Sequence, residues 1–163
     1  LYVLKKGDPH EVHVYSLRGH HIHSLRHEDR YGGVFSPTFG KALTIINDEL
    51  VVADRTNKRF SIYSLAGKLL RSVRCKEIST DRVTLCHAGG DSIIITNCHA
   101  SPELFKFNLA SGAVEWKSNS VKQSGAVAML NKEYALVTEW NSHSQVKVFV
   151  INQMTGEVIL DVL

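Results

Sequence analysis

The chain has 163 residues, of which 44% are hydrophobic and 21% charged, and its formal net charge at pH 7 is +3. This length suits one domain with a buried core, and three prolines without a low-complexity tract exclude a disordered chain. No apolar run approaches the ~20 residues of a membrane helix, so we expect no membrane partner. The sequence opens without Met or an apolar leader, which predicts that it begins inside a longer protein.

The cysteines indicate a reduced protein. Cys75, Cys86 and Cys98 are odd in number and lack a CxxC spacing, so neither a disulfide framework nor a zinc site is predicted. We interpret them as free thiols in or near strands and expect a cytoplasmic protein.

Short apolar runs alternate with turn formers along the whole chain. They are rich in Val, Ile, Leu, Phe and Tyr and are too short for helices, so we expect strands. Gly67 can take the positive φ of a tight hairpin turn between two of them. In chain order the predicted strands lie at residues 1–4, near 14–17 and 21–25, then at 42–46, 50–53, 60–65, 69–73, 83–88, 92–96, near 106–109, and at 126–130, 134–138, near 148–151 and 157–163.

One strand-and-turn motif occurs four times, in residues 14–19, 62–67, 106–112 and 148–156. Its aromatic position is Tyr15, Tyr63, Phe107 and Phe149, at spacings of 48, 44 and 42 residues. Two residues further along lie Leu17, Leu65, Leu109 and Ile151, on the same strand face, which we expect to pack between repeats.

A period of about 40–50 residues with several short strands per unit is typical of β-propeller blades. We therefore predict an all-β domain, residues 1–163, with blades of four-stranded antiparallel meander at about 1–25, 42–75, 83–117 and 126–163. The first repeat lacks an innermost strand, and the end of the chain does not supply one. This favours a segment of a larger propeller, which would self-associate; the alternative is a closed four-bladed ring.

Residues 49–75 resemble an NHL repeat, the blade unit of one propeller family. The matching positions are Ala53, Asp54, Asn57, Arg59, Ile62, Tyr63, Gly67 and Lys68. The resemblance covers about one blade and implies a ring that usually has six blades. It also implies a role as the recognition part of a larger protein, such as a ubiquitin ligase of the tripartite-motif class.

The longest predicted loops emerge at one end of the blades, because successive strands alternate in direction. Residues 1–82 contain 14 Lys and Arg against 9 Asp and Glu, and many of these cations fall at this end, among them Arg74 and Lys76. Long loops are common binding sites, so we predict a protein partner at this face. The predicted binding residues are Lys5, Lys6, Arg26, Arg30, Tyr31, Phe35, Arg55, Lys58 and Trp140.

Two other functions stay open. Basic loops with aromatics can bind single-stranded RNA. A lyase- or lactonase-type enzyme would instead place a metal in the channel, and we considered Asp54, His87, Asn97, His99 and Glu139 for it. No catalytic motif supports an enzyme, so we expect no catalytic residue, metal or cofactor. Asp54 is better explained as a structural residue that caps the loop after its strand.

Overall fold

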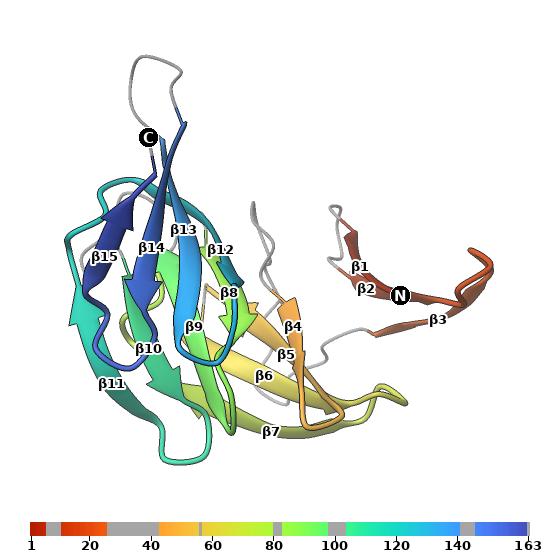
Figure 1. The fold of residues 1–163 in the computed structure, drawn as a ribbon. Helices are drawn as coiled ribbons and strands as arrows, with labels where there is room; N and C mark the ends of the chain where they lie inside the picture. The colour runs from red at the N-terminus through yellow and green to blue at the C-terminus, as the bar shows by residue number, and fades with distance from the viewer. Residues whose placement is uncertain are drawn as a thin grey trace.

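All described elements of the computed structural model are β-strands (Figure 1). It describes residues 1–5, 11–25, 43–55, 57–79, 83–97, 104–140 and 146–162. No helix that could cross a membrane occurs in these ranges. The prediction of an all-β chain is confirmed.

The strands form four antiparallel sheets, which we call blades 1 to 4. Blade 1 contains β1 (Tyr2–Lys5), β2 (Glu11–Tyr15) and β3 (His21–Leu25). Blade 2 contains β4 (Leu43–Ile46), β5 (Glu49–Asp54), β6 (Arg59–Ser64) and β7 (Leu69–Arg74). Blade 3 contains β8 (Val83–His87), β9 (Ser92–Asn97), β10 (Leu104–Asn108) and β11 (Ala113–Ser118). Blade 4 contains β12 (Ser124–Met129), β13 (Tyr134–Trp140), β14 (Val146–Asn152) and β15 (Val158–Asp161).

Each sheet is a meander, because its strands lie side by side in chain order. The blades follow one another around an arc, with blade 1 (red) and blade 4 (blue) at its two ends in Figure 1. The first strands of blades 2 to 4 form the inner side of this arc. Thr84 on β8, for example, donates its hydroxyl to the carbonyl oxygen of Gly125 on β12 at 2.9 Å. This radial order of meanders is the predicted propeller arrangement.

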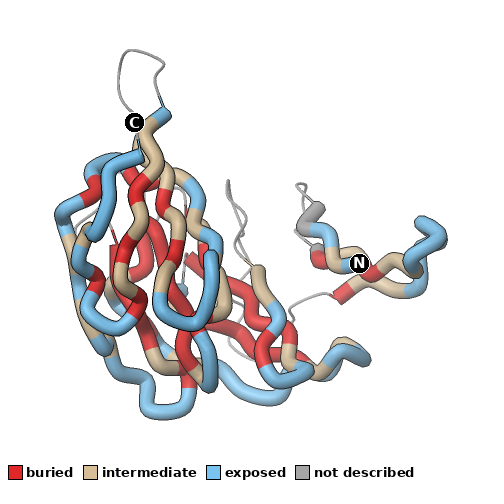
Figure 2. Tube along the Cα trace, in the orientation of Figure 1, coloured by how far each residue is buried: buried red, intermediate tan, exposed pale blue. Residues whose placement is uncertain are grey.

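Neighbouring blades are joined by clusters of buried apolar side chains. Figure 2 colours the buried residues along these strands red. Blades 1 and 2 share a cluster that includes Val14 and Tyr63. Blades 2 and 3 share the largest, which includes Phe60 and Phe107, and a third cluster joins blades 3 and 4. The strands of blades 2 and 3 are therefore stabilised by burial of apolar side chains on both faces of their sheet, against the two neighbouring blades.

The predicted alignment of the fourth repeat is wrong by two residues. Every blade has a β-bulge between its last two strands, where two residues oppose one across the ladder. Asn108 and Asn152 also cap equivalent turns by accepting backbone N–H groups two and three residues ahead. The register shifts immediately before Tyr15, Tyr63, Phe107 and Ile151, so Ile151 rather than Phe149 is the equivalent residue.

The predicted packing of the next aliphatic position holds only in part. Leu109 and Ile151 are buried, whereas Leu65 is 37% exposed and Leu17 is 92% exposed. Leu17 and Leu65 lie beyond their strands, in the turns, where strand alternation no longer directs a side chain. Leu109 also follows its strand. Its N–H donates to the carbonyl oxygen of Asp91 at 2.9 Å, and this hydrogen bond holds the turn against the rest of blade 3.

Candidate functional site

Asp54 closes the loop after β5, as predicted. Its carboxylate accepts the backbone N–H of Asn57 at 3.3 Å and the side-chain amide of Asn57 at 2.8 Å. Arg59 adds an ion pair from its Nε at 2.9 Å, and the Asp54 side chain is fully buried. These contacts fix the turn between β5 and β6, so the prediction of a structural Asp54 is confirmed.

The linker at residues 75–79 crosses from blade 2 to blade 3 and is held by both. Lys58 accepts the N–H of Cys75 with its carbonyl oxygen and donates its Nζ to the carbonyl oxygen of Ile78. From blade 3, the Asn97 side chain accepts the N–H of Ser79 at 3.1 Å and donates to the carbonyl oxygen of Glu77 at 2.7 Å. The linker is therefore a fixed part of the long-loop end.

Two cysteines lie in the described residues, and both are free thiols. Burial raises the pKa of Cys75 to about 12, with the negative charge of Glu77 acting in the same direction. Burial also raises the pKa of Cys86 to about 11. Because the thiolate is the nucleophile, neither thiol is suited to covalent catalysis near neutral pH.

A groove of about 350 Å³ lies beside this linker, between blades 2 and 3. From blade 3, the groove is lined by the buried ring of Phe107, by Gly112 in the turn between β10 and β11, and by Val114. On the other side it is lined by Arg74, at the end of β7, and by Lys76 and Glu77 of the linker. We call this feature the inter-blade groove.

The rim of the inter-blade groove is basic. Arg74 and Lys76 are exposed, and Lys117 forms an ion pair with Glu77 at 3.1 Å. Partial burial raises the pKa of Glu77, but hydrogen bonding and charge from Lys117 outweigh it and hold the pKa below its ordinary value. Glu77 is therefore ionised at neutral pH and neutralises Lys117, while Arg74 and Lys76 project into solvent.

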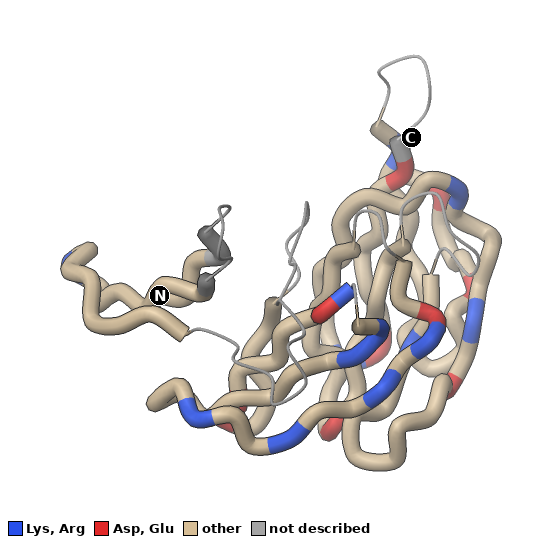
Figure 3. The backbone as a smooth tube through the Cα atoms, turned by 180° about the vertical axis from the view of Figure 1, so that it is seen from behind, with Lys and Arg blue, Asp and Glu red and all other residues tan. Residues whose placement is uncertain are grey.

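The basic rim continues along the outer strand of blade 2. Figure 3 shows Lys and Arg following one another along β7. Arg71 on this strand contacts both carboxylate oxygens of Glu49, at 2.7 and 2.8 Å. The exposed cations of this row are Lys68, Arg71, Arg74 and Lys76.

The predicted binding residues are not gathered at the inter-blade groove. Arg55 is only 3% exposed, and Lys58 is held on the linker. Lys5 and Trp140 end β1 and β13. Lys6, Arg26, Arg30, Tyr31 and Phe35 lie outside the described residues, so their binding role stays a prediction.

The residues considered for a channel metal have separate contacts. His87 contacts the carbonyl oxygen of Gly90 at 3.0 Å, and Glu139 accepts the N–H of Lys122 at 2.8 Å. Asn97 holds the linker, and His99 lies outside the described residues. Within the described ranges, no group of three or more His, Cys, Asp or Glu is placed to hold a metal ion.

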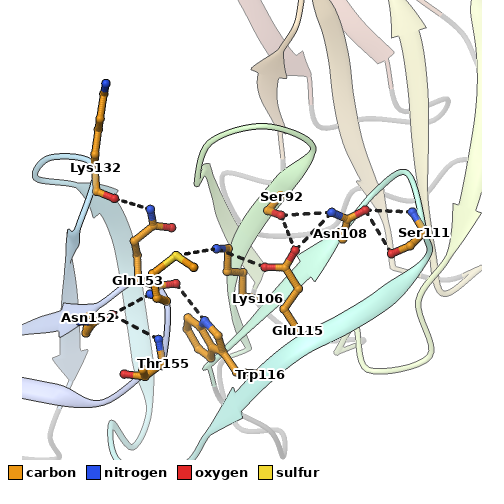
Figure 4. A network of polar contacts seen from close by, with 11 residues as sticks. Ser92, Lys106, Asn108, Ser111, Glu115, Trp116, Lys132, Asn152, Gln153 and Thr155 are labelled. Atoms are coloured by element: carbon orange, nitrogen blue, oxygen red, sulfur yellow. Dashed lines mark hydrogen bonds and ion pairs between the residues drawn. The ribbon is translucent and has the colours of Figure 1, made fainter.

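A buried lysine between blades 3 and 4 was missed by sequence reasoning (Figure 4). Lys106 is 5% exposed, and its Nζ lies 3.2 Å from the carboxylate of Glu115. Glu115 also accepts the hydroxyl of Ser92 at 2.6 Å and the amide of Asn108 at 3.2 Å. The signal in the sequence was a lysine inside the apolar run Leu104–Asn108. At the position of this lysine, the other blades have Val14, Ile62 and Val150.

Glu115 should make the stability of the protein sensitive to acid. Partial burial raises its pKa, but hydrogen bonds from Ser92, Lys106 and Asn108 lower it below 4.5. The stabilisation from ionised Glu115 is therefore present above the unfolded-state pKa and is lost as pH falls through the lower folded-state pKa. We expect Glu115→Gln to cost about 1–2 kcal/mol at pH 7 and much less at pH 3, measured by urea unfolding.

The matched control for this prediction is Lys106→Met, which removes the cation and keeps an apolar chain of similar length. In this background, the cost of Glu115→Gln should depend less on pH. An equal cost of Glu115→Gln at both pH values in the otherwise unchanged protein would contradict the prediction.

Solved structures show the same fold. The chain aligns with a protein of unknown function from Bacteroides caccae at a TM-score of 0.68 and 14% identity, over 98% of this chain and 61% of that one. BamB from Moraxella catarrhalis, a β-propeller, aligns at a TM-score of 0.58 and 16% identity, over 98% and 45%. The computationally designed Ika8 protein aligns at 0.60 and 14%, over 97% and 47%.

These identities establish the fold alone, and the chain spans about half to three fifths of the length of these three proteins. No known family profile matches the sequence, and no curated protein is similar to it at a significant level. The prediction of a β-propeller of about four blades is confirmed.

Proposed function

We propose that this chain is a non-catalytic propeller module that binds a protein partner at its long-loop end. The observation that carries the proposal is the inter-blade groove, whose lining includes the linker at this end. It combines the apolar residues Phe107 and Val114 with exposed cations at Arg74 and Lys76. The polar side chains nearby, on Asp54 and Asn97, are engaged in holding loops.

The chemistry of the groove fits an extended acidic segment of a protein. An apolar side chain of that segment would lie against Gly112 and Val114, and acidic neighbours would meet Arg74 and Lys76. Single-stranded RNA fits less well, because bases stack on exposed rings and Phe107 is buried.

The NHL resemblance supports a further proposal, about the kind of larger protein that contains this chain. Among its matching positions, Asp54 contacts both Asn57 and Arg59, so these three act together as one loop motif. We propose that the module is the cytoplasmic substrate-recognition part of a larger protein, such as a ubiquitin ligase. We also propose that the predicted binding residues Lys5, Lys6, Arg26, Arg30, Tyr31 and Phe35 contact this partner.

Charge reversal at the rim tests this function. The probes are a fluorescent decapeptide with alternating Glu and a central Phe, and a fluorescent single-stranded oligouridine. We expect Arg74→Glu with Lys76→Glu to weaken peptide binding at least about tenfold by anisotropy, because two contacts across the interface become repulsive. The control is Lys132→Glu, which changes an exposed cation in the turn between β12 and β13, at the end of blade 4 opposite the long loops. We expect it to leave the peptide affinity unchanged.

Salt dependence separates the two partner classes. Binding of RNA would weaken steeply with salt, since each neutralised phosphate releases a counterion. Tight, salt-sensitive oligouridine binding that is lost on reversal of Arg74 and Lys76 would overturn the protein proposal. Peptide binding that is unchanged by both reversals would overturn the assignment to the inter-blade groove.

A further inference from the structure

β7 is the outer edge strand of blade 2, and only its side toward β6 is paired within the sheet. Successive residues of an antiparallel strand direct their backbone N–H and C=O groups to alternate sides. The N–H of Cys75 donates to the carbonyl oxygen of Lys58 at 2.8 Å, and the preceding residue, Arg74, pairs with Arg59. The N–H and C=O groups of Ser72 and Arg74 therefore point away from β6.

The side chains of β7 are also exposed. Five of its six residues are exposed, and Val73 is half-buried. Leu69 and Leu70 are among the exposed residues, at 40% and 46%. An exposed edge of this kind is a template on which another strand can pair.

The charge of β7 differs from that of the other outer strands. β7 contains Arg71 and Arg74 and no acidic residue. β11 contains Glu115 beside Lys117, β15 contains Asp161, and β3 contains no Asp, Glu, Lys or Arg. Among the four outer strands that the structure describes, β7 is therefore the one with a basic edge.

Further cations lie beyond both ends of β7, which Figure 3 shows as a row. Exposed Lys68 precedes the strand and exposed Lys76 follows it. Glu49 neutralises Arg71, so the excess positive charge lies at the two ends of the row, at Lys68 and at Arg74 with Lys76. The row is about 25 Å long at the rise of a strand, and an extended decapeptide is long enough to cover it. Its second end is the rim of the inter-blade groove.

We propose that the acidic segment of the partner adds to the edge of β7 as a fifth strand of blade 2, paired with the outward backbone groups of Ser72 and Arg74. This inference rests on the proposed function, because it takes the same segment and extends its contact from the inter-blade groove along β7. Main-chain hydrogen bonds supply affinity in this mode of recognition, and the cations select an acidic strand. They also disfavour pairing of β7 with a second copy of itself, because like charges would then lie opposite one another.

Two N-methylated forms of the decapeptide with alternating Glu and a central Phe test the added strand. One carries N-methyl groups on its even-numbered residues and the other on its odd-numbered residues. In an added strand, only alternate N–H groups of the peptide face β7. We expect one form to bind at least about tenfold more weakly than the unmethylated peptide by anisotropy, and the other to bind within about twofold of it.

Ser72→Pro tests the same pairing from the protein side. Proline is tolerated on an edge strand where the lost N–H faces outward, so pairing with β6 should persist, and circular dichroism checks this. We expect the peptide affinity to fall at least about tenfold, because the middle of the edge loses its donor. The matched control Ser72→Ala removes the hydroxyl, keeps the N–H and should leave the affinity unchanged.

Lys68→Glu tests how far the peptide extends. Lys68 lies at the end of β7 away from the inter-blade groove, so a peptide confined to the groove would not meet it. We expect this reversal to weaken peptide binding at least about threefold. Lys132→Glu is again the control and should have no effect.

The outcomes separate this inference from the proposed function. Binding that is weakened by reversal of Arg74 and Lys76, but is equal for both methylated peptides and unchanged by Ser72→Pro, would keep the proposed function and overturn the added strand. Binding that depends on Ser72→Pro and on one set of peptide amides, but not on Arg74 and Lys76, would support the added strand and overturn the assignment to the groove.

Two further results are decisive. A protein that sediments as a dimer and becomes monomeric on Ser72→Pro would assign the edge of β7 to a second copy and overturn the inference. If Ser72→Pro does not fold, the two methylated peptides decide, because they leave the protein unchanged: a difference between them supports the added strand, and equal affinities exclude it.

Discussion

Replacing Phe60 with Ala should lower the free energy of unfolding by about 3–5 kcal/mol. Phe60 is fully buried, and its ring centroid lies 5.4 Å from that of Phe107 on the neighbouring blade. Truncation would remove the ring from the largest apolar cluster and leave a cavity that two separate sheets must collapse to fill. Urea unfolding followed by tryptophan fluorescence measures the change.

The matched control is Leu65→Ala, which truncates a side chain that is 37% exposed in the turn after β6. We expect it to cost less than about 1.5 kcal/mol, because more than a third of this residue stays in contact with water when the protein is folded. A double variant with Phe107→Ala should cost less than the sum of the single changes, since the rings are in contact. Equal costs for Phe60→Ala and Leu65→Ala would contradict the packing between blades 2 and 3.

Replacing Asp54 with Ala should cost about 3 kcal/mol, near the low end for breaking a buried ion pair. The change removes the acceptor of the N–H and amide of Asn57 and the partner of the Arg59 guanidinium. The Arg59 side chain keeps 18% exposure, so water partly compensates its charge. Thermal and urea unfolding both report this loss.

Two variants separate the roles of charge and hydrogen bonding at Asp54. Asp54→Asn retains an acceptor and should recover part of the loss. Glu49→Ala breaks the more exposed pair with Arg71, for which we expect less than about 1 kcal/mol. A cost for Asp54→Ala as small as that for Glu49→Ala would show that the loop does not depend on Asp54.

The candidate site was predictable only in outline. Arg74 and Lys76 could be placed at the long-loop end, because strand direction alternates and a meander fixes which connections share an end. The inter-blade groove could not be predicted, because it forms where the linker after blade 2 meets Phe107 of blade 3. Arg55 illustrates the same limit: its loop was predicted, but its burial depends on neighbouring segments.

Sequence alone predicted most of the strands, though not β11, together with the repeat and the role of Asp54, since these depend on alternation, turn residues and contacts between near neighbours. The alignment of Ile151 with Tyr63, the exposure of Leu65 and the burial of Lys106 were decided only by the tertiary structure. A bulge changes which residues oppose one another, and a turn changes which way a side chain points. What a blade face buries depends on the blade beside it, so strand periodicity can show that a face is apolar but cannot show what covers it.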